Sequence, residues 1–241
     1  MLHTTQGIVL HSLRYSDTSL IARILTRNFG LQSYLIPGVY KSRAKIKAGL
    51  FHPLAMIDMV CYHKDREGLQ RIKEIRNVQP LHSIMGDIRK SSVAIFISEI
   101  MLMAFRHQEP QTEAFDFIRN AIQRLDLLEE NISIFHCIFL LQLSKYLGFS
   151  PSAGYSETFC HFNIREGTYQ RTDDHTGVCL SSRESYYFYV LSRQKPGETT
   201  EVNIPSDIKK ALLQWIVNFY RYHLDTIREL KSMEILSRVF S

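Results

Sequence analysis

Residues 7–38 read GIVLHSLRYSDTSLIARILTRNFGLQSYLIPG, and this stretch decides the fold. It contains three short apolar runs, at 7–13, 19–26 and 31–38, rich in the Ile, Leu, Val and Tyr residues that favour strands. The turn-forming sequences YSDTS and RNFG separate these runs. The stretch therefore predicts three consecutive strands joined by short turns.

Two further runs, 53–62 and 69–78, extend the pattern. The first alternates in polarity as a strand with two different faces does. The second is ambiguous, because Ile72, Ile75 and Val78 recur at a spacing that also suits a helix. Five short strands in this length predict a small closed barrel, since closure removes exposed edges. An OB-fold has this strand count, and an SH3-like barrel fits nearly as well.

After Pro80 the apolar residues recur with the period of helices. Residues 149–182 lose this period and collect Ser, Gly, Asp and Thr, which indicates a loop or a small irregular unit. The predicted helices are 91–105, 112–130, 133–148, 207–224 and 229–240.

The ends of two predicted helices carry recognisable signals. Thr112, or Ser91, can cap its helix, and Gly148 followed by Pro151 is a typical stop. The chain as a whole is predicted to be α+β. Its domains are a five-stranded barrel over 1–80 and an all-helical domain over 81–241, which contains the irregular insertion at about 149–182.

Positive charge is concentrated in the first third of the chain. The 241 residues carry a formal net charge of +5. Residues 1–80 contain 12 Lys and Arg against 5 Asp and Glu, whereas residues 81–241 contain 17 against 19. This asymmetry predicts a polyanionic partner for the N-terminal part. The alternative is that a basic face merely keeps the protein soluble.

The chain shows no sign of export or membrane insertion. Its N-terminus has no basic segment followed by an apolar one, so no signal peptide is predicted. The most apolar stretch, 132–143, is too short to span a bilayer and predicts a buried helix. Four widely spaced cysteines are then expected to be reduced thiols in a cytoplasmic protein.

No catalytic motif is recognisable. We therefore predict no catalytic residue and do not expect the protein to be an enzyme. Phosphate-binding glycine loops, the G-x-S-x-G elbow and H-E-x-x-H are all missing from the sequence. The remaining enzymatic alternative is a metal-assisted nuclease that uses Asp173, Asp174 and His175.

Metal binding is also not predicted. Cys160, His161, His175 and Cys179 cluster in the irregular segment, and Cys and His are zinc ligands. A structural zinc site usually has two close ligand pairs, and here the partner of each cysteine is absent. We therefore expect neither a metal nor another cofactor.

The sequence PGVYKSRAKIKAG (37–49) is the strongest functional signal. It places Lys41, Arg43, Lys45 and Lys47 at every second position, with no acid among them. An extended backbone would put all four on one side of a strand or stretched loop. The spacing therefore predicts a basic ridge that neutralises nucleic-acid phosphates.

Other residues of the barrel can extend this surface. Aromatic rings beside the cations could stack on bases, and Tyr40 is the ring most expected to be exposed. Phe29 and Phe51 are expected to pack in the core. Arg14, Arg23 and Arg27 could widen the basic face, although each could equally be a solvated strand residue. The predicted DNA-binding residues are Lys41, Arg43, Lys45, Lys47, Arg14, Arg23 and Tyr40.

The order of these motifs resembles the RecO family of bacterial recombination mediators and DNA repair proteins. That family opens with T-x-G-I-V-L, continues with a Y-x-(D/E) strand ending in Thr, and then has an aromatic-Gly turn and a G-x-x-K basic loop. A helix ending in L-G-F-x-P follows later, as in LLQLSKYLGFSP (140–151), and ELKSMEILSRVF is similar to the family's last helix. The residues that carry the first motifs are Thr5, Gly7, Ile8, Val9, Leu10, Tyr15, Asp17, Ile21, Leu25, Thr26, Phe29, Gly30, Gly38, Lys41, Ser42 and Arg43.

The resemblance implies an N-terminal OB-fold, a helical C-terminal domain and a cytoplasmic, nucleoid-associated protein. It implies binding of single- and double-stranded DNA, annealing of complementary strands, a complex with RecR, and contact with the tail of single-stranded DNA-binding protein. Through these partners the family helps recombinase load onto coated DNA. Many members also have a four-cysteine zinc motif in the segment that matches 149–182. Because Cys160 and Cys179 lack partners, Phe159, Phe162 and Tyr169 are expected to pack this segment instead.

Two other classes of function remain open at this point. An RNA-binding or single-stranded-DNA-binding OB-fold adaptor without a recombination role fits the charge and fold equally well. A pure scaffold, whose basic segment only solvates the barrel, would have no DNA affinity near physiological salt.

Overall fold

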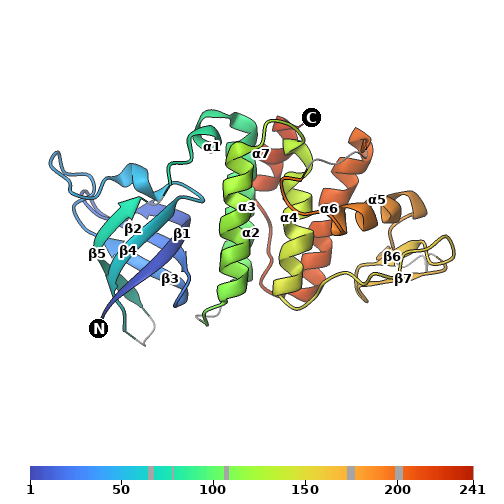
Figure 1. Ribbon diagram of the computed structural model, residues 1–241, viewed down its shortest axis with the longest axis horizontal. Helices are drawn as coiled ribbons and strands as arrows, with labels where there is room; N and C mark the ends of the chain where they lie inside the picture. Colours follow the sequence, from blue (N-terminus) through green and yellow to red (C-terminus); the bar gives the residue numbers. More distant parts are fainter. Residues whose placement is uncertain (65–67, 78, 106–108, 173–176, 199–202, 241) are drawn as a thin grey trace.

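A computed structural model of the chain describes residues 1–64, 68–77, 79–105, 109–172, 177–198 and 203–240. A β-barrel forms one end of the molecule and a group of helices forms the rest, with a small two-stranded sheet at the far end (Figure 1). None of the helices in these ranges is long and apolar enough to cross a membrane.

Five strands close the barrel in the spatial order β1-β2-β3-β5-β4, with β4 pairing back to β1. All neighbours are antiparallel except β3 and β5, which pair in parallel. The predicted five-stranded OB-fold barrel is therefore confirmed, and the ambiguous run forms a strand, not a helix, over Leu69–Asn77. The strands are β1 (Leu2–Arg14), β2 (Leu20–Thr26), β3 (Gly30–Ile36), β4 (Met56–Tyr62) and β5 (Leu69–Asn77).

The barrel strands are buried on both faces where they meet the helices. On β1, Val9 belongs to the interior core of the barrel, whereas Ile8 and Leu10 belong to the core shared with the helices. This double burial explains why GIVL is continuously apolar instead of alternating with polar residues. Position 7 requires a glycine, because a Cβ there would point into the barrel and lie 2.6 Å from Cγ2 of Ile24.

Seven α-helices occur among the described residues and enclose the larger apolar core, and a short 3-10 helix, η1 (Ala48–Phe51), precedes β4. The predicted buried helix is confirmed as α4, which is apolar on almost every side. The helices are α1 (His82–Gly86), α2 (Ile88–Ala104), α3 (Thr112–Leu127), α4 (Ile132–Tyr146), α5 (Ser182–Ser192), α6 (Ser206–His223) and α7 (Ser232–Val239).

The predicted helix ends are partly correct. Gly148 has a φ of +87°, as expected for the residue that stops α4. The capping predictions for Thr112 and Ser91 are wrong. The side chain of Asp87 caps α2 by accepting a hydrogen bond from the backbone N–H of Arg89, and α3 follows Gln111 without a side-chain cap.

The segment predicted to be irregular contains regular structure. Strands β6 (His161–Asn163) and β7 (Thr168–Gln170) form the two-stranded sheet, so the C-terminal region is not purely helical. Helix α5 begins at the end of the same segment with a capping box made by Ser181 and Glu184. Strands of three residues are too short to show the alternation of apolar and polar residues by which a strand is predicted from sequence.

The barrel and the helices are joined by polar contacts as well as by the shared core. Arg27, next to β2, forms an ion pair with Asp116 on α3 at 2.9 Å. On the same helix, Arg119 donates a hydrogen bond from Nη1 to the side-chain oxygen of Gln6, at 3.3 Å. The outer face of β1 is therefore held against α2 and α3.

Candidate nucleic-acid interface

The basic segment leaves the end of β3 and projects from the side of the barrel that faces away from the helices (Figure 1). Its backbone is turned and not extended. The N–H of Lys41 donates to the carbonyl of Gly38 at 3.2 Å, and the N–H of Ala44 donates to the carbonyl of Lys41 at 3.0 Å. Gly38 has a φ of +77°, which favours glycine. The prediction of a strand or stretched loop is therefore wrong for the first half of this segment.

All four predicted cations are nevertheless exposed: Lys41, Arg43, Lys45 and Lys47. The segment is held by apolar residues between them. Val39 is buried in the interior core of the barrel, and Ile46 packs against the same core. Alternation of exposed and partly buried residues, which the spacing predicted for the whole segment, holds only from Arg43 to Gly49.

Arg14 and Tyr40 meet beside this basic segment. The guanidinium carbon of Arg14 lies 5.2 Å from the centroid of the Tyr40 ring. Arg14 also pairs with Asp17, at 3.7 Å, and the N–H of Tyr40 donates to the carbonyl of Thr18 at 3.5 Å. Arg14 and Tyr40, two predicted site residues that are far apart in sequence, thus lie on one surface. Asp17 and Thr18, in the segment between β1 and β2, hold them there.

Tyr40 is exposed as predicted, with 42% of its surface accessible, but other rings are more so. Tyr15 is 61% exposed in the turn after β1, and Tyr62 is 48% exposed at the end of β4. Phe51 is buried in the barrel core, and Phe29 packs against that core, as expected for both. Sequence alternation could have placed Tyr62 on the outside of β4, because its neighbour Cys61 points inward.

Arg23 and Arg27 have different positions. Arg23 is partly exposed on the outer face of β2, opposite His11 on β1 and Ser33 on β3. It lies along the strand and not in the basic segment. Of the two alternatives for Arg27, the structure does not favour a place in the basic face, because Arg27 is paired with Asp116 on α3.

The irregular segment does not provide a metal site among the described residues. In those parts of the chain, no group of three or more His, Cys, Asp or Glu side chains could hold an ion. Cys179 is buried and its Sγ accepts a hydrogen bond from Nε2 of Gln170. Asp173, Asp174 and His175, the proposed nuclease residues, lie outside the described residues.

The aromatic residues expected to pack this segment behave differently from one another. Phe162 and Tyr169 are buried and join the core of the helical region. Phe159 is 40% exposed, so the expectation that it packs is wrong; the guanidinium carbon of Arg171 lies 5.2 Å from its ring centroid.

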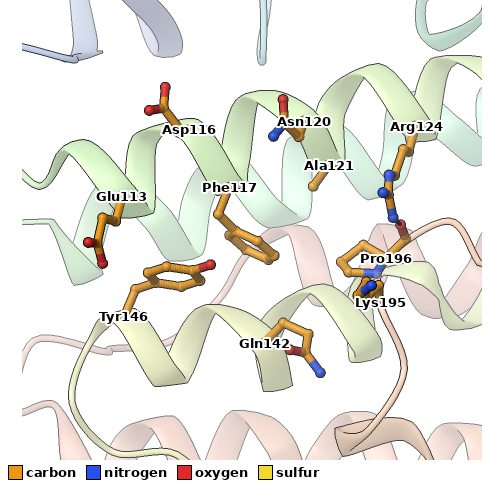
Figure 2. Close-up of a pocket in the computed structure, with 10 residues that line it drawn as sticks. All are labelled: Glu113, Asp116, Phe117, Asn120, Ala121, Arg124, Gln142, Tyr146, Lys195 and Pro196. Carbon is orange, nitrogen blue, oxygen red and sulfur yellow. Dashed lines mark hydrogen bonds between the residues drawn. The ribbon is translucent and has the colours of Figure 1, made fainter.

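A pocket of about 490 Å³ lies between α3 and α4 (Figure 2). The rings of Phe117 and Tyr146 stack in it with centroids 4.9 Å apart. At one end, Nη1 of Arg124 donates to the carbonyl of Pro196 at 3.2 Å. Glu113 stands at the other end, so the two ends of this pocket carry opposite charge.

A second pocket, also of about 490 Å³, lies among α4, α6 and α7. Lys209 and Lys210 from the first turns of α6 line it together with apolar side chains. His136 lines it as well and is buried, and burial lowers the pKa of this imidazole to about 3. The apolar lining residues are Leu213, Leu236 and Phe240.

Comparisons with known proteins agree across the whole chain. Residues 1–81 match the family model described as "Recombination protein O N terminal", and residues 85–234 match the one described as "Recombination protein O C terminal". The chain is 34% identical to "DNA repair protein RecO" of Flavobacterium psychrophilum, over 98% of both chains. It is 30% and 32% identical to proteins with the same description from Azobacteroides pseudotrichonymphae and Phocaeicola vulgatus, over 100% of each chain.

Proposed function

The chain belongs to the RecO family of DNA repair proteins, and on that premise we propose that it is a recombination mediator that binds single- and double-stranded DNA through its barrel. The observation that carries this proposal is the exposed basic segment. It presents Lys41, Arg43, Lys45 and Lys47 on a turned backbone whose apolar residues hold it to the barrel. Cations arranged in this way contact phosphates and set affinity without reading base sequence.

The contribution of each cation follows from its surroundings. Lys41 directly follows Tyr40, whose ring contacts Arg14, and Arg43 is two residues further along, so one strand can meet charge and an aromatic face together. Lys45 and Lys47 extend the positive surface toward the following turn. No acid lies between residues 37 and 49 to oppose the phosphates.

Annealing follows from the same surface. Two complementary strands repel each other through their phosphates, and a shared cationic surface lowers that repulsion. The protein then needs no covalent chemistry, which agrees with the absence of catalytic motifs from the sequence. Loading of recombinase onto DNA coated by single-stranded DNA-binding protein is the purpose that we propose for this activity.

The experiment is fluorescence anisotropy of a labelled oligonucleotide, single-stranded and then duplex, across a salt series. Wild type is compared with Lys41→Ala/Arg43→Ala. Removing two phosphate contacts should weaken binding and reduce the slope of log K against log salt by about 1.4 to 1.8. The matched control is Arg228→Ala/Lys231→Ala, which removes two exposed cations from the helical region.

Annealing of complementary oligonucleotides is measured with the same three proteins. Annealing should fall together with binding in the double variant of the basic segment and stay unchanged in the control. Annealing that survives the loss of binding would contradict the shared-surface mechanism. Preference for RNA over DNA of equal length would favour the alternative of an OB-fold adaptor without a recombination role.

We also propose that the tail of single-stranded DNA-binding protein docks in the pocket among α4, α6 and α7. An acidic peptide that ends in an aromatic residue needs cations beside an apolar cavity. Lys209 and Lys210 lie there beside Leu213, Leu236 and Phe240. This pocket has one acidic lining residue, Asp207, which pairs with Arg183 at 3.3 Å. The pocket between α3 and α4 is less suitable because two acids, Glu113 and Asp116, line it.

A fluorescent acidic peptide with a C-terminal aromatic residue tests this placement. Lys209→Ala/Lys210→Ala should weaken its binding about tenfold or more, whereas Lys195→Ala in the other pocket should leave it unchanged.

RecR is a further proposed partner, and co-elution of the two purified proteins tests it. A nucleoid-associated position in the cytoplasm is proposed from the same family and is tested by fluorescence microscopy.

A further inference from the structure

The pocket among α4, α6 and α7 lies where two helices begin. Ser133 is in the first turn of α4, Ser206 and Asp207 are the first residues of α6, and all three line the pocket. Nζ of Lys209 donates a hydrogen bond to Oγ of Ser133 at 3.3 Å, which joins the two first turns. The first turn of a helix leaves backbone N–H groups without an intrahelical partner and carries partial positive charge. This end of the pocket therefore suits an anion.

The charges around these two helix ends favour the same kind of ligand. Helix α4 follows Asn131 and α6 follows Pro205, and neither of these residues provides a side-chain cap. The exposed Lys210 adds a second ammonium group to that of its neighbour on α6. Asp207 also lines the pocket, but its carboxylate is paired with Arg183. Positive charge therefore dominates at the helix ends.

A buried histidine in the wall of the pocket is an independent observation. His136 follows Ser133 by three residues, or about 4.5 Å along the axis of α4. It lines the same pocket and is only 3% exposed. Its Nδ1 is buried and has no hydrogen-bond partner among the described residues. Buried polar atoms normally have a partner, so an orphaned one in a pocket wall points to a ligand that supplies it.

The chemistry of this imidazole limits what the ligand is. Burial lowers the pKa of His136 to about 3, so the ring is neutral at pH 7 and has one N–H donor and one nitrogen acceptor. A neutral ring of this kind matches an uncharged polar group and not a phosphate. The ring of Phe240 lies with its centroid 6.1 Å away, and Leu213 extends the apolar wall. This part of the pocket therefore fits a flat apolar group with a polar edge.

A nucleoside phosphate combines these two requirements in one molecule. Its phosphate matches the helix ends and the lysines, and its base has an apolar face and an edge with hydrogen-bond donors and acceptors. The cavity of about 490 Å³ is in the range that holds small molecules. Inorganic phosphate would leave Nδ1 of His136 without a partner. The phenyl ring of an acidic peptide would do the same, because it has no hydrogen-bonding group.

We propose that this pocket binds a free nucleoside phosphate, with the phosphate at the first turns of α4 and α6 beside Lys209 and Lys210, and with the base against Phe240 and hydrogen-bonded to Nδ1 of His136. The ligand fills the volume in which the acidic tail is proposed to dock, so the two compete. This competition rests on the proposed function, whereas binding of the nucleotide does not. Free nucleotide then regulates how readily the protein is recruited through the tail.

Isothermal titration calorimetry of the full chain tests the binding. The probes are ADP, GDP, CDP and UDP, with inorganic phosphate and the free nucleosides as the two halves of the ligand. At least one nucleotide should bind about tenfold or more tightly than either of its halves.

Two variants separate the two ends of the pocket. His136→Phe keeps an aromatic ring but removes the nitrogen, so it should weaken nucleotide binding about 5- to tenfold and leave inorganic phosphate unchanged. Lys209→Ala/Lys210→Ala should weaken both probes. Lys195→Ala, in the pocket between α3 and α4, is the matched control and should change neither. Far-UV circular dichroism and a thermal unfolding curve verify that each variant is folded.

Displacement of the fluorescent acidic peptide tests the competition. The nucleotide that binds most tightly should release the peptide from wild type, and about 5- to tenfold more of it should be needed with His136→Phe. Nucleotide binding no tighter than that of inorganic phosphate, or unchanged in a folded His136→Phe, would overturn the inference. Binding without release of the peptide would overturn the competition. A peptide that does not bind to wild type, when the nucleotide does, would instead overturn the proposed docking of the tail.

Discussion

Arg27, at the end of β2, holds the carboxylate of Asp116 on α3 through two hydrogen bonds, at 3.2 Å from Nε and 2.9 Å from Nη2. This bidentate contact ties the barrel to the helices and fixes the orientation of the two side chains. The hydrogen bond from Arg27 is the main reason that the pKa of Asp116 is lowered from its ordinary value. Both side chains are partly exposed, at 40% and 35%, so salt screens the pair.

Asp116→Asn should therefore lower the thermal midpoint slightly at low salt, and the difference from wild type should shrink in 1 M salt. Because the pKa of Asp116 is lowered in the folded state, the pair stabilises the protein at neutral pH, and this contribution is lost as the pH falls through that lowered pKa. Thermal unfolding at two salt concentrations, at pH 7 and near pH 3, measures both effects. Asp225→Asn, at an exposed carboxylate, is the control. An equal loss at low and high salt would contradict the ionic explanation.

Gly38→Ala should weaken DNA binding without touching a cation. The φ of +77° costs an L-residue about 1–2 kcal/mol, which would reduce DNA affinity about 5- to 30-fold if the turned segment must be ordered to bind. Gly49→Ala is the matched control, since its new Cβ would meet nothing within 4 Å and its φ is not positive. Anisotropy with a labelled oligonucleotide measures both variants. Unchanged affinity for Gly38→Ala would mean that the segment binds in another conformation.

His136 should make the stability of the protein depend on pH. Burial lowers its pKa to about 3, whereas an unfolded chain binds this proton near about 6.5. Stability is therefore fully present above about pH 6.5 and is lost progressively as the pH falls toward 3, by up to about 1.4 kcal/mol per pH unit. His136→Phe, beside the rings of Phe96 and Phe240, should remove this dependence. Urea unfolding at pH 7, 6 and 5 measures it, and parallel curves for the two proteins would exclude His136 as the source.

Glu99 on α2 should control how firmly α7 is held. Its carboxylate accepts hydrogen bonds from the backbone N–H groups of Lys231, at 3.0 Å, and Ser232, at 2.9 Å, and from the Ser232 hydroxyl. Glu99→Ala should cost about 0.5–2 kcal/mol, as for the loss of a helix cap. Hydrogen exchange of the α7 amides should become faster, and binding of the acidic peptide should weaken because Leu236 lines its proposed pocket. Glu113→Ala, at an exposed carboxylate of α3, should change neither.

The strands of the barrel could be predicted from the sequence because the signals for each strand lie within that strand and its flanking turns. Alternation in 53–62 and the turn residues between the runs place each strand without knowledge of its partners. The turned conformation of the basic segment was missed, because an every-second spacing of cations indicates an extended backbone unless the buried Val39 and the partly buried Ile46 are recognised as its anchors.

Long-range pairings were beyond the reach of the sequence. Asp116, which neutralises Arg27, lies 89 positions further along the chain. The neighbours of Leu13 and Tyr62 on the adjacent strands likewise follow only from the registers of the strand pairs. One signal was available: in LIARILT (20–26), Ile21 and Leu25 are apolar on the face opposite Leu20 and Ile24, so both faces of β2 had to be covered or used.

The parallel pairing of β3 with β5 constrains how the protein folds while it is being synthesised. The barrel cannot close until β5 has been synthesised, so the apolar faces of β1 remain exposed to solvent until then. Even then, Ile8 and Leu10 stay uncovered until α2 follows, which at about 5–20 residues per second takes on the order of seconds. The nascent chain thus has an interval in which its first strand is exposed to other chains, and chaperone demand should be greatest there.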